Sequence, residues 1–179
     1  MRIISGKYKG KKIDGYNIIG TRPTMDRVKE SLFGIIQNKI RDSVCLDLFA
    51  GSGSLGLEAI SNGSKHCYFV DNNNVAINTL RKNVKDLKEE NCSLIYNDYK
   101  RALQEFAQKG IKFDIIFLDP PYKLNLVNEC LRSVKNLDLI KKDGIIICEY
   151  ENENLCDDYF PLIKEKKYGT TYIKIYKNI

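Results

Sequence analysis

The segment Asp119-Pro120-Pro121-Tyr122 combines residue types that are suited to a chemical step. It directly follows the apolar run 113–118, which predicts a buried strand. Because proline lacks a backbone N–H, the two prolines end the strand and leave carbonyl groups of the turn free to accept hydrogen bonds. Free carbonyls, a carboxylate and an aromatic ring suit a flat ligand that carries an NH2 group, such as a nucleobase with an exocyclic amine. A surface turn that only terminates a strand is the alternative interpretation.

A second segment with functional residue types is rich in glycine. Residues 46–56 place Gly51, Gly53 and Gly56 in a GxGxxG spacing between a predicted strand and a predicted helix, where backbone can approach a ligand closely. The next predicted strand ends at Asp71, about 20 residues later, from where a carboxylate accepts hydrogen bonds from ribose hydroxyls in folds of this type. The paired spacing predicts a nucleoside cofactor.

Charge decides which cofactor is expected, because dinucleotide and S-adenosylmethionine folds share this geometry. Asp47 lies four residues before Gly51, where its carboxylate would repel a pyrophosphate and attract a sulfonium or ammonium group. Asp98 and Asp119 follow the third and fourth predicted strands, at the carboxyl edge where ligands of α/β sheets bind. Together with Asp71, these acids predict a cationic cofactor such as S-adenosyl-L-methionine.

The elements that must position these residues are short apolar runs that alternate with helical patterns from residue 43 onward. This order predicts a parallel sheet covered by helices. We expect strands at residues 44–48, 66–71, 93–97, 113–118, 144–149, 165–167 and 171–176. We expect helices at residues 54–62, 74–89, 100–109 and 126–136. Before this core, residues 2–4 and 11–13 flank a glycine-rich turn and predict a small hairpin, and the apolar positions of residues 24–40 predict an amphipathic helix.

The net charge of +6 is concentrated near the start of the chain. Residues 1–42 hold ten basic residues against four acidic ones, whereas residues 43–179 hold 19 of each sign. Such a segment is typical of a nucleic-acid contact, with a solvated basic face as the alternative. We expect one domain over residues 1–179, in which the basic N-terminal hairpin and helix precede a catalytic, cofactor-binding core.

The composition narrows the class of protein. With 43% hydrophobic and 29% charged residues, the chain is typical of globular proteins, and it has neither an apolar stretch that could span a bilayer nor a signal-peptide pattern. We therefore expect a cytoplasmic protein that does not contact a membrane. The six cysteines contain no CxxC spacing, and His66 is the single histidine. Neither a metal site nor a cysteine nucleophile is expected.

The motifs together resemble class I S-adenosylmethionine-dependent methyltransferases that modify exocyclic amino nitrogens, and Asp119–Tyr122 is similar to their catalytic motif. More closely, residues 2–10 (Arg-Ile-Ile-Ser-Gly-Lys-Tyr-Lys-Gly) and 21–33 (Thr-Arg-Pro-Thr-Met-Asp-Arg-Val-Lys-Glu-Ser-Leu-Phe) resemble the bacterial 16S ribosomal RNA guanine(N2)-methyltransferase family. The chain departs from that family's pattern at Ser5, where glycine is expected, and at Gly34, where a larger residue is expected.

The resemblance implies an α/β, Rossmann-like class I methyltransferase fold with a seven-stranded, mostly parallel sheet, helices on both faces, and a small N-terminal β-hairpin and helix extension. It implies methyl transfer from S-adenosyl-L-methionine to the exocyclic amine of one guanine in small-subunit (16S) ribosomal RNA. The expected partner is ribosomal RNA or the small ribosomal subunit, and the protein is expected to act as a monomer without a metal.

The resemblance also implies a role for individual residues. Asp119 and the Pro120 carbonyl would orient the amine, and Tyr122 would stack on the base. The expected catalytic residues are Asp119, Pro120, Pro121 and Tyr122. The expected cofactor-binding residues are Asp47, Phe49, Gly51, Gly53, Asp71, Asn72, Asp98 and Thr24. The expected RNA-contacting residues are Arg2, Gly6, Lys7, Tyr8, Lys9, Gly10, Lys11 and Arg22.

Two other classes of function remain open at this point. The same turn can hold any planar NH2 group, including that of adenine in RNA or DNA and that of a glutamine amide in a protein. From a different class, a non-catalytic RNA-binding or ribosome assembly protein could retain a cofactor fold. The intact Asp119 and the glycine spacing argue against the non-catalytic alternative.

Overall fold

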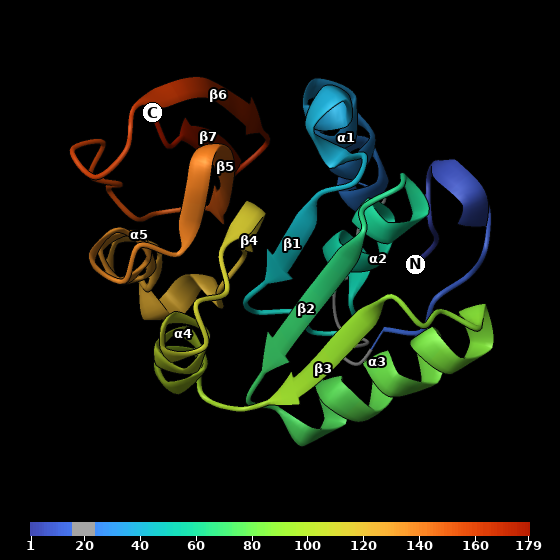
Figure 1. The fold of residues 1–179 in the computed structure, drawn as a ribbon. Helices are drawn as coiled ribbons and strands as arrows, with labels where there is room; N and C mark the ends of the chain where they lie inside the picture. The colour runs from blue at the N-terminus through green and yellow to red at the C-terminus, as the bar shows by residue number, and fades with distance from the viewer. Residues whose placement is uncertain (16–23) are drawn as a thin grey trace.

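The computed structural model describes residues 1–15 and 24–179, in which strands and helices alternate. The strands are β1 (Val44–Asp47), β2 (His66–Asp71), β3 (Cys92–Tyr96), β4 (Phe113–Leu118), β5 (Ile140–Tyr150), β6 (Leu162–Tyr168) and β7 (Thr171–Lys177). The helices are α1 (Thr24–Ile40), α2 (Ser54–Ser61), α3 (Asn74–Leu87), α4 (Tyr99–Gln108) and α5 (Val127–Asn136). Two short 3₁₀ helices, η1 (Gly6–Tyr8) and η2 (Tyr122–Leu124), complete the fold (Figure 1).

The strands form one seven-stranded sheet in the order β3-β2-β1-β4-β5-β7-β6. Strands β1 to β5 pair in parallel, whereas β7 runs antiparallel to both β5 and β6. The predicted α/β fold with a mostly parallel sheet is therefore confirmed. The strand order reverses between β1 and β4, because the connection after β1 leads to β2 on one side and the connection after β4 leads to β5 on the other. Such switch points open a crevice at the carboxyl ends of the strands.

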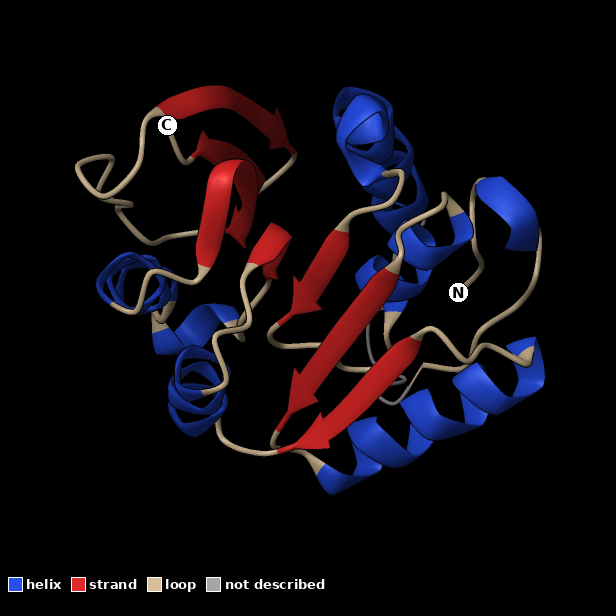
Figure 2. Ribbon diagram, in the orientation of Figure 1, coloured by secondary structure: helices blue, strands red, loops and turns tan. Residues whose placement is uncertain are grey.

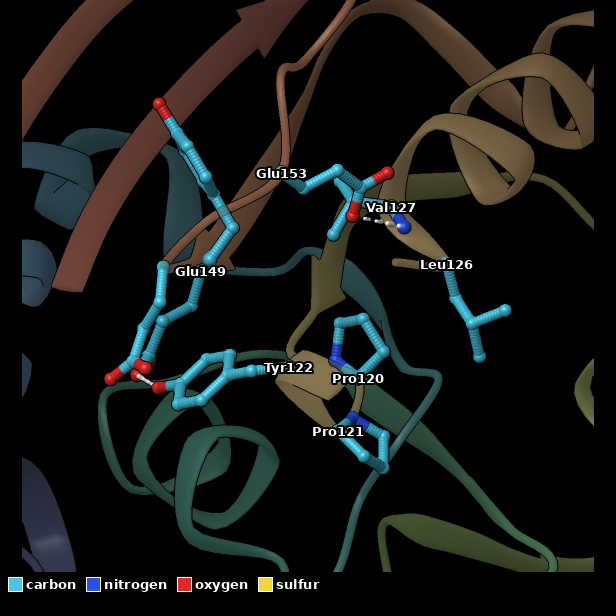
Figure 3. A pocket seen from close by; sticks show the side chains of 9 residues that line it. Pro120, Pro121, Tyr122, Leu126, Val127, Glu149 and Glu153 are labelled. Atoms are coloured by element: carbon cyan, nitrogen blue, oxygen red, sulfur yellow. Dashed lines mark hydrogen bonds between the residues drawn. The ribbon is translucent and has the colours of Figure 1, made fainter. Parts of the chain in front are cut away.

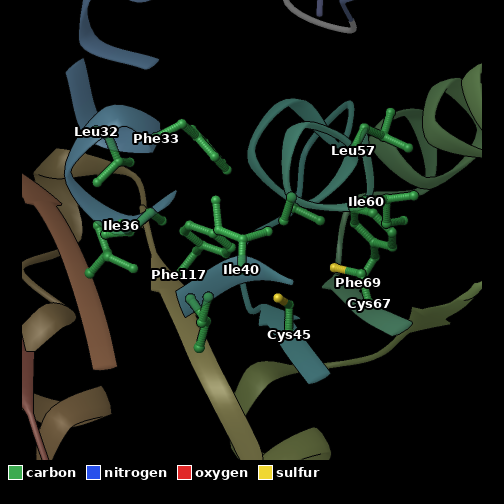
Figure 4. Packing of buried hydrophobic residues seen from close by; sticks show 14 of the residues in the cluster. Leu32, Phe33, Ile36, Ile40, Cys45, Leu57, Ile60, Cys67, Phe69 and Phe117 are labelled. Atoms are coloured by element: carbon green, nitrogen blue, oxygen red, sulfur yellow. The ribbon is translucent and has the colours of Figure 1, made fainter. Parts of the chain in front are cut away.

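Helices cover both faces of the sheet, as predicted (Figure 2). On one face, α1 and α2 contribute residues such as Phe33, Ile36 and Leu57 to a buried core (Figure 4). On the other face, α4 and α5 contribute a second core. Alternation along β4 explains the division, because Phe117 belongs to the first core and the next residue, Leu118, to the second.

The predicted N-terminal hairpin is absent as a pair of strands. A single antiparallel bridge joins Arg2 and Lys12, and the turn between them contains η1. Gly6 begins this turn with a φ of +79°, and a Cβ atom there would lie 1.9 Å from the carbonyl oxygen of Ser61. The turn therefore packs against the C-terminal end of α2.

Strand boundaries differ from the prediction mainly in the last third of the chain. The expected strand 165–167 extends over Leu162–Tyr168, and the expected strand 144–149 begins at Ile140. β6 is an edge strand in which most residues are exposed, so its lysines do not alternate with buried apolar residues. A strand without that alternation lacks the main sequence signal by which strands are recognised.

The N-terminal segment is held to the core through Glu58, which is fully buried on α2. Its carboxylate accepts hydrogen bonds from the backbone N–H groups of Ile4 and Ser5 and lies 3.1 Å from the ammonium of Lys29 on α1. The same ammonium donates to the carbonyl of Arg2 at 2.7 Å. One buried carboxylate thus fixes the segment against two helices.

Two expected absences concern the described part of the chain. No helix there is long and apolar enough to cross a membrane. No group of three or more His, Cys, Asp and Glu side chains there is arranged to hold a metal ion. All six cysteines are free thiols, four of them buried.

Candidate active site at the carboxyl edge of the sheet

The crevice at the switch point contains a pocket of about 390 Å³. It is lined by Phe49, Asp71, Asn72, Asn73, Asp119, Pro120, Pro121 and Tyr122. These residues follow β1, end or follow β2, or follow β4, so the topology gathers them at one edge of the sheet. The structure therefore brings the expected catalytic turn together with three of the expected cofactor-binding residues.

The glycine-rich loop is locked to the end of β2 by Asp71. One oxygen of the carboxylate accepts a hydrogen bond from Gly51 N at 2.8 Å, and the other accepts one from Asn73 N at 2.8 Å. Gly51 and Gly53 have φ angles of 55° and 90°, which favour glycine. A Cβ atom at Gly53 would also lie 2.3 Å from Leu80 Cδ1. The loop can therefore follow this path only with glycine.

Asp47, an expected cofactor-binding residue, lies beneath the glycine-rich loop, which it contacts, and is not among the residues that line the pocket. Its side chain is 1% exposed and accepts a hydrogen bond from Gly56 N at 3.0 Å. The pKa of Asp47 is raised to about 7, mainly by burial; the hydrogen bond from the Gly56 N–H opposes this rise, and the negative charge of Asp71 adds to it. The negative charge at this position therefore depends on pH in the neutral range.

Asp98 is also outside the pocket lining. It is the N-cap residue of α4, and its Oδ1 accepts from the backbone N–H groups of Lys100 and Arg101 at 2.9 and 3.3 Å. This is a typical use of an aspartate at a helix start. Thr24 begins α1, but its side chain, like the whole of Arg22, lies outside the described residues.

The turn Asp119–Tyr122, which is the expected catalytic segment, keeps one backbone carbonyl available. The Pro121 carbonyl accepts from Leu124 N at 3.0 Å, whereas the Pro120 carbonyl accepts no hydrogen bond from any described residue. Pro120 itself is buried, and Asp119 is half-buried at the end of β4. A free carbonyl and a carboxylate on adjacent residues can accept one hydrogen bond each from the two N–H groups of one amino group.

Glu149 is a site residue that the sequence did not reveal. Tyr122 donates its hydroxyl hydrogen to Glu149 Oε1 at 2.7 Å (Figure 3). Leu118 of β4 pairs with Cys148 of β5, so Asp119 and Glu149 follow a paired position on adjacent strands. An acid at the last position of the predicted strand 144–149 was the available signal, but only the pairing of β5 with β4 brings it to the turn.

The electrostatics of this acid pair are unusual. Burial raises the pKa of Asp119 well above its usual range, and the negative charges of Glu149 and Asp47 raise it further. Burial likewise raises the pKa of Glu149, while the hydrogen bond from Tyr122 opposes the rise. Burial beside these two carboxylates also raises the pKa of the Tyr122 hydroxyl, which therefore stays a donor. Two neighbouring carboxyl groups in this environment titrate as a pair.

A cavity of only about 10 Å³ lies behind the turn, with Leu126, Val127 and Glu149 among its lining residues (Figure 3). Glu153 also lines this cavity, and its carboxylate accepts hydrogen bonds from the backbone N–H groups of Val127 and Asn128 at 3.1 and 2.9 Å. These bonds satisfy the first turn of α5. The turn Asp119–Tyr122 is thus packed on one face and open to the larger pocket on the other.

The expected RNA-contacting residues begin at the opposite edge of the sheet. Lys7 Nζ and Tyr8 Oη both lie 2.7 Å from Glu89 Oε2, and Tyr8 N donates to the hydroxyl of Ser61 at the end of α2. Arg2 pairs with Asp26 at 3.0 Å. Residues 1–12 contain five basic side chains, and two of them, Arg2 and Lys7, are therefore paired with acidic side chains within the protein.

Residues 9–12 are open to solvent, and the segment then continues toward the glycine-rich loop. Lys9, Gly10 and Lys11 are exposed. Further along, Asp14 N donates to Asn83 Oδ1, and Asn83 Nδ2 in turn donates to the carbonyl of Ser52 in the loop. The segment therefore links the amino edge of the sheet with the pocket edge.

Comparison with known proteins adds independent findings. A family model described as "Conserved hypothetical protein 95" matches residues 1–177. The chain is 41% identical over 181 residues to "Putative rRNA methyltransferase YlbH" of Bacillus subtilis, covering 99% of this chain and 98% of that protein. It is 36% identical over 182 residues to "Ribosomal RNA small subunit methyltransferase D" of Haemophilus influenzae, covering 99% and 94%. A solved structure, "Putative methyltransferase yhhF" from Escherichia coli, superposes with a TM-score of 0.88 at 33% identity, covering 99% and 97%.

Proposed function

The chain belongs to the family described as "Conserved hypothetical protein 95", a family of class I S-adenosylmethionine-dependent methyltransferases, and on that basis we propose that it methylates the exocyclic N2 amine of a guanine in 16S ribosomal RNA. The names of two similar proteins support ribosomal RNA as the substrate. The N-terminal signature supports guanine as the base. One observation carries the proposal: Asp119, the free Pro120 carbonyl and the Tyr122 ring border one pocket with Asp71.

The residues of the pocket fit a nucleoside cofactor with a positive charge. Asp71 offers carboxylate oxygens to ribose hydroxyls, and Phe49 offers an aromatic face beside them. Ser54 Oγ is buried at the start of α2 and has no hydrogen-bond partner among the described residues. It can therefore donate a hydrogen bond to a carboxylate of a ligand at that helix start. S-adenosyl-L-methionine, when bound, supplies an electrophilic methyl group on a sulfonium. We propose Phe49, Gly51, Gly53, Asp71 and Asn72 as its direct contacts, with Asp47, Asp98 and Thr24 in support.

Asp119 would act on the amine of the substrate. The lone pair of an aromatic amine is delocalised into the ring, so the nitrogen is a weak nucleophile until its N–H bonds are oriented. The Asp119 carboxylate and the Pro120 carbonyl can accept hydrogen bonds from both N–H groups of the amine and hold its nitrogen toward the methyl group. As the N–C bond forms, positive charge develops on the nitrogen, and an ionised Asp119 stabilises it and can accept the released proton.

Tyr122 and the basic segment would bind the RNA. The ring of Tyr122 is 37% exposed at the pocket and can stack on the target base, a contact worth about 1–3 kcal/mol. Lys9, Lys11, Gly6 and Gly10 are exposed and can contact phosphates. We propose Arg22, which lies outside the described residues, as a further phosphate contact. Because this segment leads from the amino edge to the pocket edge, we propose that an extended RNA surface, as in the small subunit, is bound rather than a single nucleotide.

We further propose that residues 1–42 serve RNA contact and residues 43–179 serve catalysis within one monomeric domain. The contacts of Glu58 with the N-terminal segment support this arrangement, since they fix the segment to the catalytic core. Gel filtration with light scattering measures the mass directly, and a mass of 20.6 kDa is expected for the free protein.

The proposed activity is tested with tritiated S-adenosyl-L-methionine and, separately, naked ribosomal RNA, small subunits, DNA and protein extract. Digestion of the labelled product to nucleosides should give N2-methylguanosine from the small-subunit RNA. Label on adenosine, on DNA or on glutamine would replace the proposal with the corresponding alternative. The variant Asp119→Ala should lose methyl transfer while it still binds the cofactor. The matched control Asp138→Ala removes an exposed ion pair with Lys112 and should retain methyl transfer.

A further inference from the structure

The ring of Tyr122 is held at the pocket by one well-formed hydrogen bond. Its hydroxyl donates to Glu149 Oε1 at 2.7 Å, on the strand next to the one that carries Asp119 (Figure 3). The polar end of the ring is therefore tied to the sheet, while the aromatic face borders the pocket.

The backbone of Tyr122 supplies little additional restraint. Its neighbours Pro121, Lys123 and Leu124 are exposed, and Leu124 is 58% exposed although it is apolar. η2 is only three residues long and ends at Asn125, which has a φ of 47°. A short turn with exposed neighbours has few buried contacts, and such segments have low local stability. Without a side-chain anchor, the ring would reorient readily.

Glu149, in contrast, lies on a rigid element. It pairs with Ile173 of β7, and its neighbour Cys148 pairs with Leu118 of β4, so hydrogen-bonded strands flank it on both sides. Most of its surface is covered, although it is not part of the larger pocket. A site residue on a central strand can hold a loop residue with the precision that a reacting geometry requires.

We propose that Glu149 is a positioning residue for methyl transfer: it holds the Tyr122 ring at the pocket so that the target base stacks with its amine beside Asp119. The inference rests on the proposed function, since it assigns the stacking role to Tyr122. Glu149 touches neither base nor cofactor in this scheme. On the plateau of the pH–rate profile, where Asp119 is ionised, it acts through the tyrosine hydroxyl.

A double-mutant cycle tests the link, with methyl transfer to the small subunit measured on the plateau of the pH–rate profile. Tyr122→Phe and Glu149→Ala should each lower kcat/KM about tenfold, because a hydrogen bond to a charged group is lost. The double variant should be no more than about twofold worse than either single variant, because both break the same bond. Glu149→Gln retains an acceptor oxygen and should stay within about threefold of wild type.

The chain offers a matched control pair. Tyr150 donates to Glu165 Oε1 at 2.9 Å, which is another tyrosine–glutamate hydrogen bond, and neither residue borders the larger pocket. Tyr150→Phe and Glu165→Ala should leave kcat/KM within about twofold of wild type. A loss equal to that of Tyr122→Phe would mean that any such bond matters, which would overturn the specific role of Glu149.

A second measurement needs no turnover. In protein labelled with 3-fluorotyrosine, the resonance that disappears in Tyr122→Phe should shift in Glu149→Ala and stay in place in Glu165→Ala. An unchanged resonance in Glu149→Ala would overturn the inference, as would multiplicative losses in the double variant or a Glu149→Gln as impaired as Glu149→Ala. If wild-type protein labels no RNA, the proposed function fails instead, and the two failures are thereby distinguished.

Discussion

The carboxylate of Asp71 accepts a hydrogen bond from the backbone N–H of Gly51 at 2.8 Å, which joins the two cofactor motifs of the sequence in one contact. Its second oxygen is oriented by Asn73 N at 2.8 Å. The side chain is thereby fixed at the pocket wall, and each oxygen retains a lone pair for a ligand hydroxyl. The 20-residue spacing of the two motifs thus corresponds to a physical connection.

We predict that Asp71→Ala weakens binding of S-adenosyl-L-methionine at least tenfold, because both the ribose acceptor and the support of the loop are lost. Asp71→Asn retains one acceptor oxygen and should fall between the alanine variant and wild type. Isothermal titration calorimetry measures both. Asp86→Asn, an exposed aspartate of α3, serves as the control and should bind normally. Wild-type affinity in Asp71→Ala would remove this residue from the cofactor site.

The pH dependence of methyl transfer should report the acid pair of Asp119 and Glu149. Since burial and mutual repulsion raise the pKa of Asp119, the rate should rise with pH in a range above that of an ordinary carboxylate. Glu149→Gln removes the neighbouring negative charge and makes Asp119 easier to ionise. The acid limb of the kcat profile should therefore move to lower pH in this variant, and a move to higher pH would contradict the proposed ionised state.

Asp47 should make the stability of the free protein depend on pH. Its pKa is raised to about 7 in the folded chain, so the folded state binds more protons than the unfolded state between that value and the usual carboxylate range. The free energy of unfolding should therefore decrease as pH rises through this interval, by roughly 1.4 kcal/mol per pH unit at most. Asp47→Asn keeps an acceptor for Gly56 N, and its urea unfolding curves should lack this part of the decrease. If the free energy of unfolding depended on pH in the same way in the variant and in wild type, Asp47 would not be the source of this decrease.

The sequence predicted the positions of the acids better than their partners. Strand ends place Asp47, Asp71 and Asp119 at one edge, because the carboxyl ends of parallel strands always meet there. Predicting that Glu149 lies at the site would have required the order of the strands in the sheet, which no local sequence pattern reveals. For the same reason, the excess of positive charge in residues 1–42 was visible, whereas the pairing of Lys7 with Glu89 was not, since the two residues are 82 positions apart.

The ion pair of Lys29 and Glu58 should be important for stability. Glu58→Ala leaves the Lys29 ammonium 5% exposed and without its carboxylate, and it leaves the N–H groups of Ile4 and Ser5 without an acceptor. Breaking a buried pair in this way costs about 3–5 kcal/mol. Urea unfolding should show this loss, whereas the exposed pair Lys82–Asp14 should change stability by less than about 1 kcal/mol when Asp14→Ala removes it. Equal losses would show that Glu58 is not a buried anchor.

RNA binding should depend on the exposed lysines of the N-terminal segment. Deleting residues 1–12 is a poor test, because it also removes Ile3, which is 0% exposed, and the groups that bind Glu58. The triple variant Lys9→Gln, Lys11→Gln and Lys12→Gln keeps these contacts. It should weaken RNA binding and reduce the slope of log K against log salt by about 2 to 3, since each contact with phosphate contributes about 0.7 to 0.9.

The matched control for that variant is Lys109→Gln with Lys142→Gln, two exposed lysines at the end of α4 and in β5. Their loss lowers the net charge without touching the N-terminal segment, so the affinity should change little and the slope should stay within about 0.5 of wild type. Fluorescence anisotropy of a labelled 16S RNA fragment at several salt concentrations gives both quantities. An equal reduction of the slope in the control would mean that RNA responds to total charge, and the N-terminal segment would then lose its assigned role in RNA contact.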